Sequence, residues 1–112
     1  MQKLSLVAKG RELLEKARQT SAGRAAETVY GGHEHGLRQT LVALRSGTAL
    51  ADHGSPGEAT LHVLSGRIRL TAEPDSWEAI DGDLLFVPAK RHRVDALTDA
   101  TLLLTVAVAI HP

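Results

Sequence analysis

Six histidines are the side chains in this 112-residue sequence that are best suited to proton transfer or metal binding near neutral pH. Two of them, His33 and His35, flank Glu34 in an HEH run, and on a β-strand this spacing would put both on one face. The sequence contains no Cys, which excludes disulfides, thiolate metal sites and a Cys nucleophile. Any metal would therefore be held by nitrogen and oxygen ligands.

Signatures of several other function classes are absent from the sequence. Ser55 lacks the nucleophile-elbow context of a Ser/His/Asp enzyme, and neither GxGxxG nor the P-loop pattern occurs. Thirteen Lys and Arg residues balance thirteen Asp and Glu residues, and aromatic residues make up only 3% of the chain. Because this composition offers neither a basic patch nor a base-stacking platform, we expect no nucleic acid and no membrane among the partners.

One helix is indicated ahead of the residues that could do chemistry. Apolar residues recur at near-helical spacing in a stretch rich in Lys, Glu and Arg, which predicts an amphipathic helix from about Ser5 to about Gln19. The same stretch has no uninterrupted apolar core of signal-peptide length, so we expect a cytoplasmic location. The apolar run from Thr101 to Ile110 is too short for the ~20 residues of a membrane helix and is interpreted as a buried strand.

The rest of the chain has the pattern of an all-β fold, because short apolar runs alternate with turn residues. Ser65 and Gly66 form the centre of a tight hairpin, where Gly supplies the positive φ. A mass of 12.0 kDa allows one core, so we expect a helix and linker over residues 1–25 and one sandwich or barrel over residues 26–112. The expected strands are Glu27–Tyr30, Leu37–Leu44, Ala49–His53, Ala59–Leu64, Arg67–Thr71, Trp77–Ile80, Leu84–Val87, Arg93–Ala96 and Thr101–Ile110.

Two segments resemble the two motifs of small single-domain cupins. Gly47, five residues, His53 and the segment PGEATLHVLSG that ends at Gly66 are similar to the first motif, G(X)5HXH(X)3-4E(X)6G. The segment from Gly82 to His92, GDLLFVPAKRH, is similar to the short form of the second motif, GDxxxxPxxxxH. The resemblance implies an all-β cupin jelly-roll β-barrel of the cupin-2 or RmlC-like type, with the N-terminal helix packed outside and a homodimer as the assembly.

The same resemblance implies a metal site built from two His of the first motif, its Glu, and the His of the second motif. His53 and His92 match the first and last of these positions, whereas Ser55 and Ala59 occupy the other two. Ser is a poor ligand for a divalent metal and Ala is none, so Fe, Mn, Ni or Zn would need a third ligand from elsewhere. The candidates are Glu58, His35, His62, Gln39, His33 and Glu34.

Strand alternation decides which of these candidates reach the barrel interior. If Ala59 faces inward, then Leu61 and Val63 face inward with it, and His62 faces outward or into a dimer interface. Glu58 would then point outward unless a β-bulge intervenes. Arg67 and Arg69 share a face, which we interpret as the solvated side of a hairpin. The expected pocket lining is His53, Ser55, His92, Gln39, His35, Leu61, Val63 and Phe86.

Apolar walls with a few polar groups are typical of a small-molecule site. The sequence therefore predicts a small-molecule-binding cupin with a degenerate metal site and a non-catalytic or weakly catalytic binding or sensor role. The alternative is a metal-dependent oxygenase or isomerase of a small organic substrate, in which His53 and His92 act with a non-standard third ligand. A third hypothesis, from another class, is a structural interaction domain whose barrel is packed shut.

Overall fold

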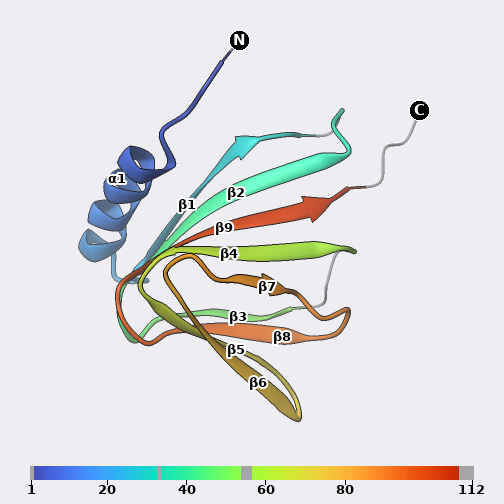
Figure 1. The fold of residues 1–112 in the computed structure, drawn as a ribbon. Coiled ribbons are helices and arrows are strands. Elements are labelled where there is room, and N and C mark those ends of the chain that lie inside the picture. The colour runs from blue at the N-terminus through green and yellow to red at the C-terminus, as the bar shows by residue number, and fades with distance from the viewer. Residues whose placement is uncertain (1, 33, 54–56, 109–112) are drawn as a thin grey trace.

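The computed structural model describes residues 2–32, 34–53 and 57–108 and, except at 51–53, their side chains. One helix and nine strands lie within these residues (Figure 1). Their bounds are α1 Leu6–Gln19, β1 Arg24–Tyr30, β2 Leu37–Leu44, β3 Ala49–His53, β4 Ala59–Ser65, β5 Arg67–Ala72, β6 Asp75–Ile80, β7 Leu84–Phe86, β8 His92–Ala96 and β9 Ala100–Ala107.

The strands form two antiparallel sheets that face each other (Figure 1). The strand order is β1-β2-β9-β4-β7 in the five-stranded sheet and β3-β8-β5-β6 in the four-stranded sheet. Both inner faces contribute to one apolar core, which confirms the all-β architecture expected from the sequence. The buried core residues are Val42, Leu44, Leu61, Val63, Ile68, Leu70, Ala72, Ala79, Val94, Ala96, Ala100 and Leu102.

Helix α1 lies on the outer face of the five-stranded sheet, over β1 and β2 (Figure 1). Ser5 caps the helix, because its Oγ accepts a hydrogen bond of 3.1 Å from the backbone N–H of Ala8. Leu13 and Ala17 are buried against Leu41 of β2. Among the described residues, no helix is long and apolar enough to cross a membrane.

A carboxylate at one end of the sheets ties α1 to two turns. Asp99, between β8 and β9, lies 2.9 Å from Arg18 Nη2 through its Oδ2. Its Oδ1 accepts a hydrogen bond of 2.8 Å from the backbone N–H of Ser46, in the turn between β2 and β3. The amide of Ser46 and the guanidinium of Arg18 hold the pKa of Asp99 below its ordinary value of 3.8, because both stabilise the charged carboxylate.

The observed strands confirm the expected ones, with shifts at their ends. The largest difference at a strand start is in β1, which begins at Arg24 rather than Glu27, so part of the expected linker is strand. The structure pairs Arg24 with Leu44 and Ala25 with Ala43 of β2. The residue types at 24 and 25 do not indicate this pairing. At the other end of the chain, β9 ends at Ala107, and residues 109–110 of the expected strand lie outside the described residues.

The hairpin between β4 and β5 has the turn that its sequence predicts. Gly66 has φ +95°, in the left-handed region where only Gly is free of strain. A Cβ at this position would also collide with the backbone carbonyl oxygen of Asp99. The hairpin therefore requires Gly66 for two separate steric reasons.

Candidate functional site

His92 is the functional candidate that the structure places inside the barrel. It begins β8, it is 6% exposed, and it alternates with the buried residues Val94 and Ala96, so it lies on the inner face. Its Nδ1 lies 2.9 Å from the carbonyl oxygen of Lys90. Because a carbonyl oxygen only accepts, Nδ1 donates this hydrogen bond.

The backbone of His53 is brought opposite His92, as the motif frame requires. In the β3–β8 ladder, Leu50 pairs with Val94 and His53 pairs with His92, with a register shift between the two pairs. Three residues of β3 therefore span two residues of β8, which is the geometry of a β-bulge. The side chain of His53 and the whole of Ser55 lie outside the described part of the chain.

The position of the motif Glu is occupied by Ala59 at the start of β4. The β4–β9 ladder is regular from the Ala59–Val106 pair to the Val63–Leu102 pair, so Ala59 lies on the same inner face as Leu61 and Val63. The methyl group of Ala59 has no atom that could bind a metal or a ligand donor. The barrel therefore has no metal-binding atom at the position where the resemblance implies a carboxylate.

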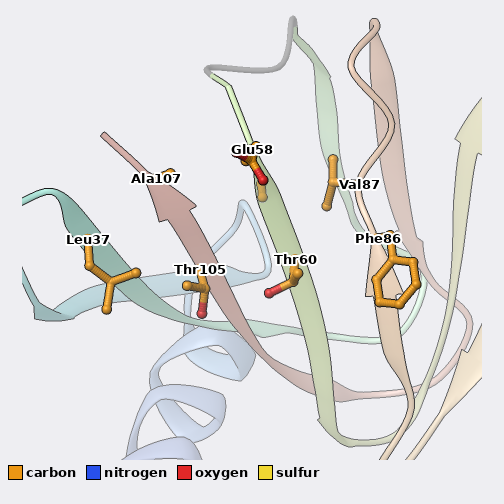
Figure 2. Close-up of a pocket in the computed structure, with 8 residues that line it drawn as sticks. Leu37, Glu58, Thr60, Phe86, Val87, Thr105 and Ala107 are labelled. Carbon is orange, nitrogen blue, oxygen red and sulfur yellow. The ribbon is translucent and has the colours of Figure 1, made fainter. Parts of the chain in front are cut away.

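Glu58 does not fill this gap. It is exposed, and it lines a groove on the outer side of the sheet together with Thr60 and Phe86 (Figure 2). The register shift of the β4–β9 ladder lies between Val63 and Ser65, at the far end of β4, so it does not turn the side chain of Glu58 inward. The sequence expectation that Glu58 points outward without a bulge is confirmed, and its hypothetical role as a third ligand in the barrel is wrong.

His35 also lies outside the barrel. It follows β1 in an exposed turn, and its ring makes an edge-to-face contact with Tyr30 at a centroid distance of 5.3 Å. This contact with the end of β1 accounts for its position. The expectation that His35 lines the pocket is therefore not met, and His33 lies outside the described residues.

Two further residues expected in the pocket lie on the outer face of the five-stranded sheet. Gln39 shares the face of Leu41, which packs under α1, and its Nε2 donates a hydrogen bond of 3.2 Å to Thr105 Oγ1. Phe86 pairs with Thr60 and is 81% exposed. Both expectations fail because alternation does not indicate which face is inside when the two faces of a run are alike. The run Leu84–Phe86 is apolar on both faces, and Arg38, Gln39 and Thr40 are polar on both.

The core of the inner face is apolar, and alternation with the buried Val42 places the half-buried Arg38 and Thr40 on the same side of β2. Leu61 lies in this core as expected. The sequence analysis did not name the four partly buried residues that pack against it, which are Leu50, Leu85, Val87 and Leu104. The inward position of Leu104 could have been predicted from the sequence, because Leu104 lies two residues from the buried Leu102 on one strand and shares its face. His62 is half-buried on the outer face, opposite Leu103, which confirms its expected orientation.

These residues do not fit the metal site that the resemblance implies. Ala59 supplies no donor atom, and Glu58 and His35 lie outside the barrel. No group of three or more His, Asp or Glu residues that could hold a metal ion occurs within the described residues. A first-row metal held by protein alone generally needs at least three such ligands, and His92 is one.

The outer groove that contains Glu58 has a volume of about 400 Å³ (Figure 2). It runs across the outer sides of β2, β9, β4 and β7. Its lining is mostly apolar or uncharged, with Glu58 as the charged member. The lining residues are Leu37, Glu58, Ala59, Thr60, Phe86, Val87, Thr105 and Ala107.

Comparison with known proteins decides the fold. A conserved protein of unknown function from Streptococcus pyogenes superposes with a TM-score of 0.74 at 21% identity, covering 98% of this chain and 90% of that chain. An RmlC-like cupin from Desulfovibrio desulfuricans superposes with a TM-score of 0.65 at 25% identity, covering 75% of this chain and 81% of that chain. The chain has the cupin fold. This result confirms the resemblance seen in the two motifs.

The cupin fold here is also similar to part of an enzyme. The salicylate 1,2-dioxygenase from Pseudaminobacter salicylatoxidans superposes with a TM-score of 0.74 at 19% identity, over 88% of this chain and 32% of that chain. No protein-family model and no curated protein matches the sequence. At these identities, the structural matches establish the cupin jelly roll and no particular activity.

Proposed function

We propose that this protein binds a small molecule inside the cupin barrel, with His92 as its polar anchor and without a cupin-type metal. The observation that carries the proposal is the buried, oriented imidazole of His92 on an inner face whose core is apolar and whose donor set is broken at Ala59. An apolar cavity wall with one or two polar groups is the usual composition of a small-molecule site.

A buried imidazole supports a ligand that carries a polar group, because the ring can exchange a hydrogen bond with that group. The apolar inner-face residues Leu61 and Leu104 suit an apolar ligand body. A phenol combines both features. The similar dioxygenase is named for salicylate, a phenol, and a mutant of that enzyme was solved in complex with gentisate.

Isothermal titration with phenol, salicylate and gentisate tests this proposal, with benzoate as the matched probe that lacks the phenolic hydroxyl. We expect the phenols to bind and benzoate to bind at least ~10-fold more weakly, because one hydrogen bond is worth about 1 kcal/mol or more in a dry site. His92→Ala should weaken binding of the phenols by a similar factor. The matched control is His62→Ala, which removes the half-buried imidazole of the outer face.

Two results would contradict the proposal. The first is binding of the phenols that His92→Ala and His62→Ala leave equally strong, because the ligand would then lie outside the barrel. The second is the absence of heat and of any thermal shift with all three phenols, which would leave the barrel as a packed interaction domain.

A second candidate, a metal-dependent oxygenase or isomerase, is favoured by the similarity to the salicylate dioxygenase over 88% of this chain. Elemental analysis of the untagged protein after incubation with Fe(II), Mn(II), Ni(II) or Zn(II) distinguishes the two candidates. A near-stoichiometric metal that is lost in a His53→Ala, His92→Ala double variant would support the enzyme and overturn the metal-free proposal. We expect less than ~0.1 metal per chain, because the described donor set is one imidazole.

A further inference from the structure

Arg38 is a charged side chain on the inner side of the five-stranded sheet. The β2–β9 ladder is regular over its whole length, and Arg38 lies on the same strand face as Val42, which is buried in the core between the sheets. Arg38 is half-buried near the start of β2. Because an arginine side chain is always charged in proteins, the inner face carries a positive charge at this position.

The guanidinium of Arg38 has no partner within the chain as far as the structure describes it. No hydrogen bond and no ion pair of Arg38 occurs among the described residues. By contrast, Arg18 and Arg69 bind carboxylates, and Arg45 donates a hydrogen bond to a backbone carbonyl oxygen. Arg11 is exposed on α1 and is solvated by water. A partly buried cation is attracted to an anion more strongly than a solvated one, because the surrounding dielectric is lower.

The inner face beside Arg38 offers no carboxylate. The backbone ladders place Val106 of β9 next to Arg38, and Ala59 of β4 next to Val106, in one row across the sheet. Two strand spacings put the Cα atoms of Arg38 and Ala59 about 10 Å apart. Ala59 occupies the position where the resemblance implies a Glu. The row therefore has a cation at one end and no anion at the other.

Arg38 and His92 belong to the same end of the barrel. Strands β2, β4 and β8 begin at this end and β9 ends there (Figure 1). Thr40 lies on the same side of β2 as Arg38, and its Oγ1 is 3.4 Å from Oγ1 of Thr28 on β1. Hydroxyl groups therefore extend the polar surface next to the guanidinium, on the sheet opposite His92.

We propose that the ligand of the barrel is an organic acid whose carboxylate binds Arg38. This inference rests on the proposed function, because it specifies the charge of the molecule that His92 would anchor. A guanidinium forms two parallel, charge-assisted hydrogen bonds with a carboxylate, and threonine hydroxyls can donate to the same oxygens. The same positive charge repels a divalent metal ion, so Arg38 favours an anionic ligand over a metal.

Isothermal titration with salicylate and salicylamide tests the proposal. The two probes share the ring and the phenolic hydroxyl, but only salicylate carries a carboxylate. We expect the wild type to bind salicylate at least ~10-fold more tightly, because a hydrogen bond to a charged group contributes more than a neutral one. Arg38→Gln should reduce this preference to less than ~2-fold, mainly by weakening salicylate binding. Arg38→Lys should retain part of the preference, because it keeps the charge and loses the paired donors.

Arg69→Gln is the matched control. It removes the same charge from a strand, but Arg69 is exposed on the outer face of the four-stranded sheet and pairs with Glu78, which confirms its expected position on the solvated side of the hairpin. This variant should keep the preference for salicylate. His92→Ala should weaken both probes by a similar factor, which separates the anchor from the charge contact. Thermal melts by circular dichroism verify that each variant is folded.

The outcomes separate this inference from the proposed function. Binding of salicylamide by a wild type that shows no preference for salicylate would overturn the role of Arg38 and leave the proposed function standing. A preference that survives Arg38→Gln, or that Arg69→Gln removes equally, would overturn it too. A preference that depends on Arg38 but not on His92 would support the inference and contradict the anchor. Failure of both probes to bind the wild type would overturn both proposals.

Discussion

At the scale of single residues, two side chains separate this barrel from the metal site that the resemblance implies. Ala59 lies on the inner face of β4 where the resemblance implies a carboxylate, and Ser55 stands where it implies an imidazole. His92 keeps its position and its hydrogen bond to Lys90. A backbone carbonyl partner of this kind fixes the tautomer of a metal-ligating His as well as that of a ligand-binding one.

We predict that a Ser55→His, Ala59→Glu double variant gains a metal site. Together with His53 and His92, the two substitutions restore the set of three His and one Glu that the resemblance implies, so Ni(II) or Zn(II) should bind with an affinity at least ~100-fold above that of the wild type. Titration calorimetry and elemental analysis measure the change. The matched control is His62→Glu with Ser55→His, which adds the same two side chains but places the carboxylate on the outer face. Equal metal affinity in both variants would contradict the prediction.

At the scale of elements, α1 is held to the sheets by two separate kinds of contact. Leu13 and Ala17 provide the apolar contact with the sheet. Asp99 provides the polar one, because its carboxylate binds both Arg18 and the backbone of Ser46. The apolar contact is independent of pH, whereas the polar contact depends on the charge of Asp99.

We predict that stability falls at acid pH partly through Asp99. Its pKa is lowered in the folded state, so its contribution is fully present above the ordinary value of 3.8 and is lost as the pH falls through the folded pKa. Asp99→Asn should therefore lower the urea midpoint at pH 7 and flatten its decline below pH ~4. Asp75→Asn removes an exposed carboxyl at the start of β6 and is the matched control. Superimposable pH profiles for the wild type and Asp99→Asn would contradict the prediction.

At the scale of the whole molecule, three layers account for most of the buried surface: α1, the five-stranded sheet and the four-stranded sheet (Figure 1). The core between the sheets contains aliphatic side chains such as Leu102, which has no exposed surface. The outer side of β4 and β7 lacks a third layer, because α1 lies over β1 and β2. Exposed side chains there, such as Leu84, should therefore contribute little to the folding of one copy.

We predict that two leucines of the same sheet contribute very differently to the free energy of unfolding. Leu102→Ala should lower the free energy of unfolding by about 2–5 kcal/mol, because it creates a cavity between the sheets. Leu84→Ala, at a residue 53% exposed, should change the stability of the single chain by less than ~0.5 kcal/mol. Urea denaturation at two protein concentrations separates folding from association. A loss for Leu84→Ala that is large and independent of concentration would contradict this division of roles.

The sequence by itself determined the elements and their order. Period-two runs and turn residues located all nine described strands, the helix from Leu6 to Gln19, and the hairpin at Gly66, because these features depend on neighbours in the chain. The motif spacing also matched His53 and His92 to two positions of one site, and the structure pairs the backbones of these two residues. Local periodicity and backbone conformational preference are enough for such predictions.

Only the tertiary structure decided which face of each strand points inward. Gln39 and Phe86 were expected in the barrel and lie outside, although the strands that carry them were located correctly. Alternation requires residues two apart to share a face, but it assigns that face to the core only when the other face is polar. Where the two faces are alike, apolar around Phe86 and polar around Gln39, the assignment depends on where α1 and the second sheet pack, and this is a long-range property of the fold.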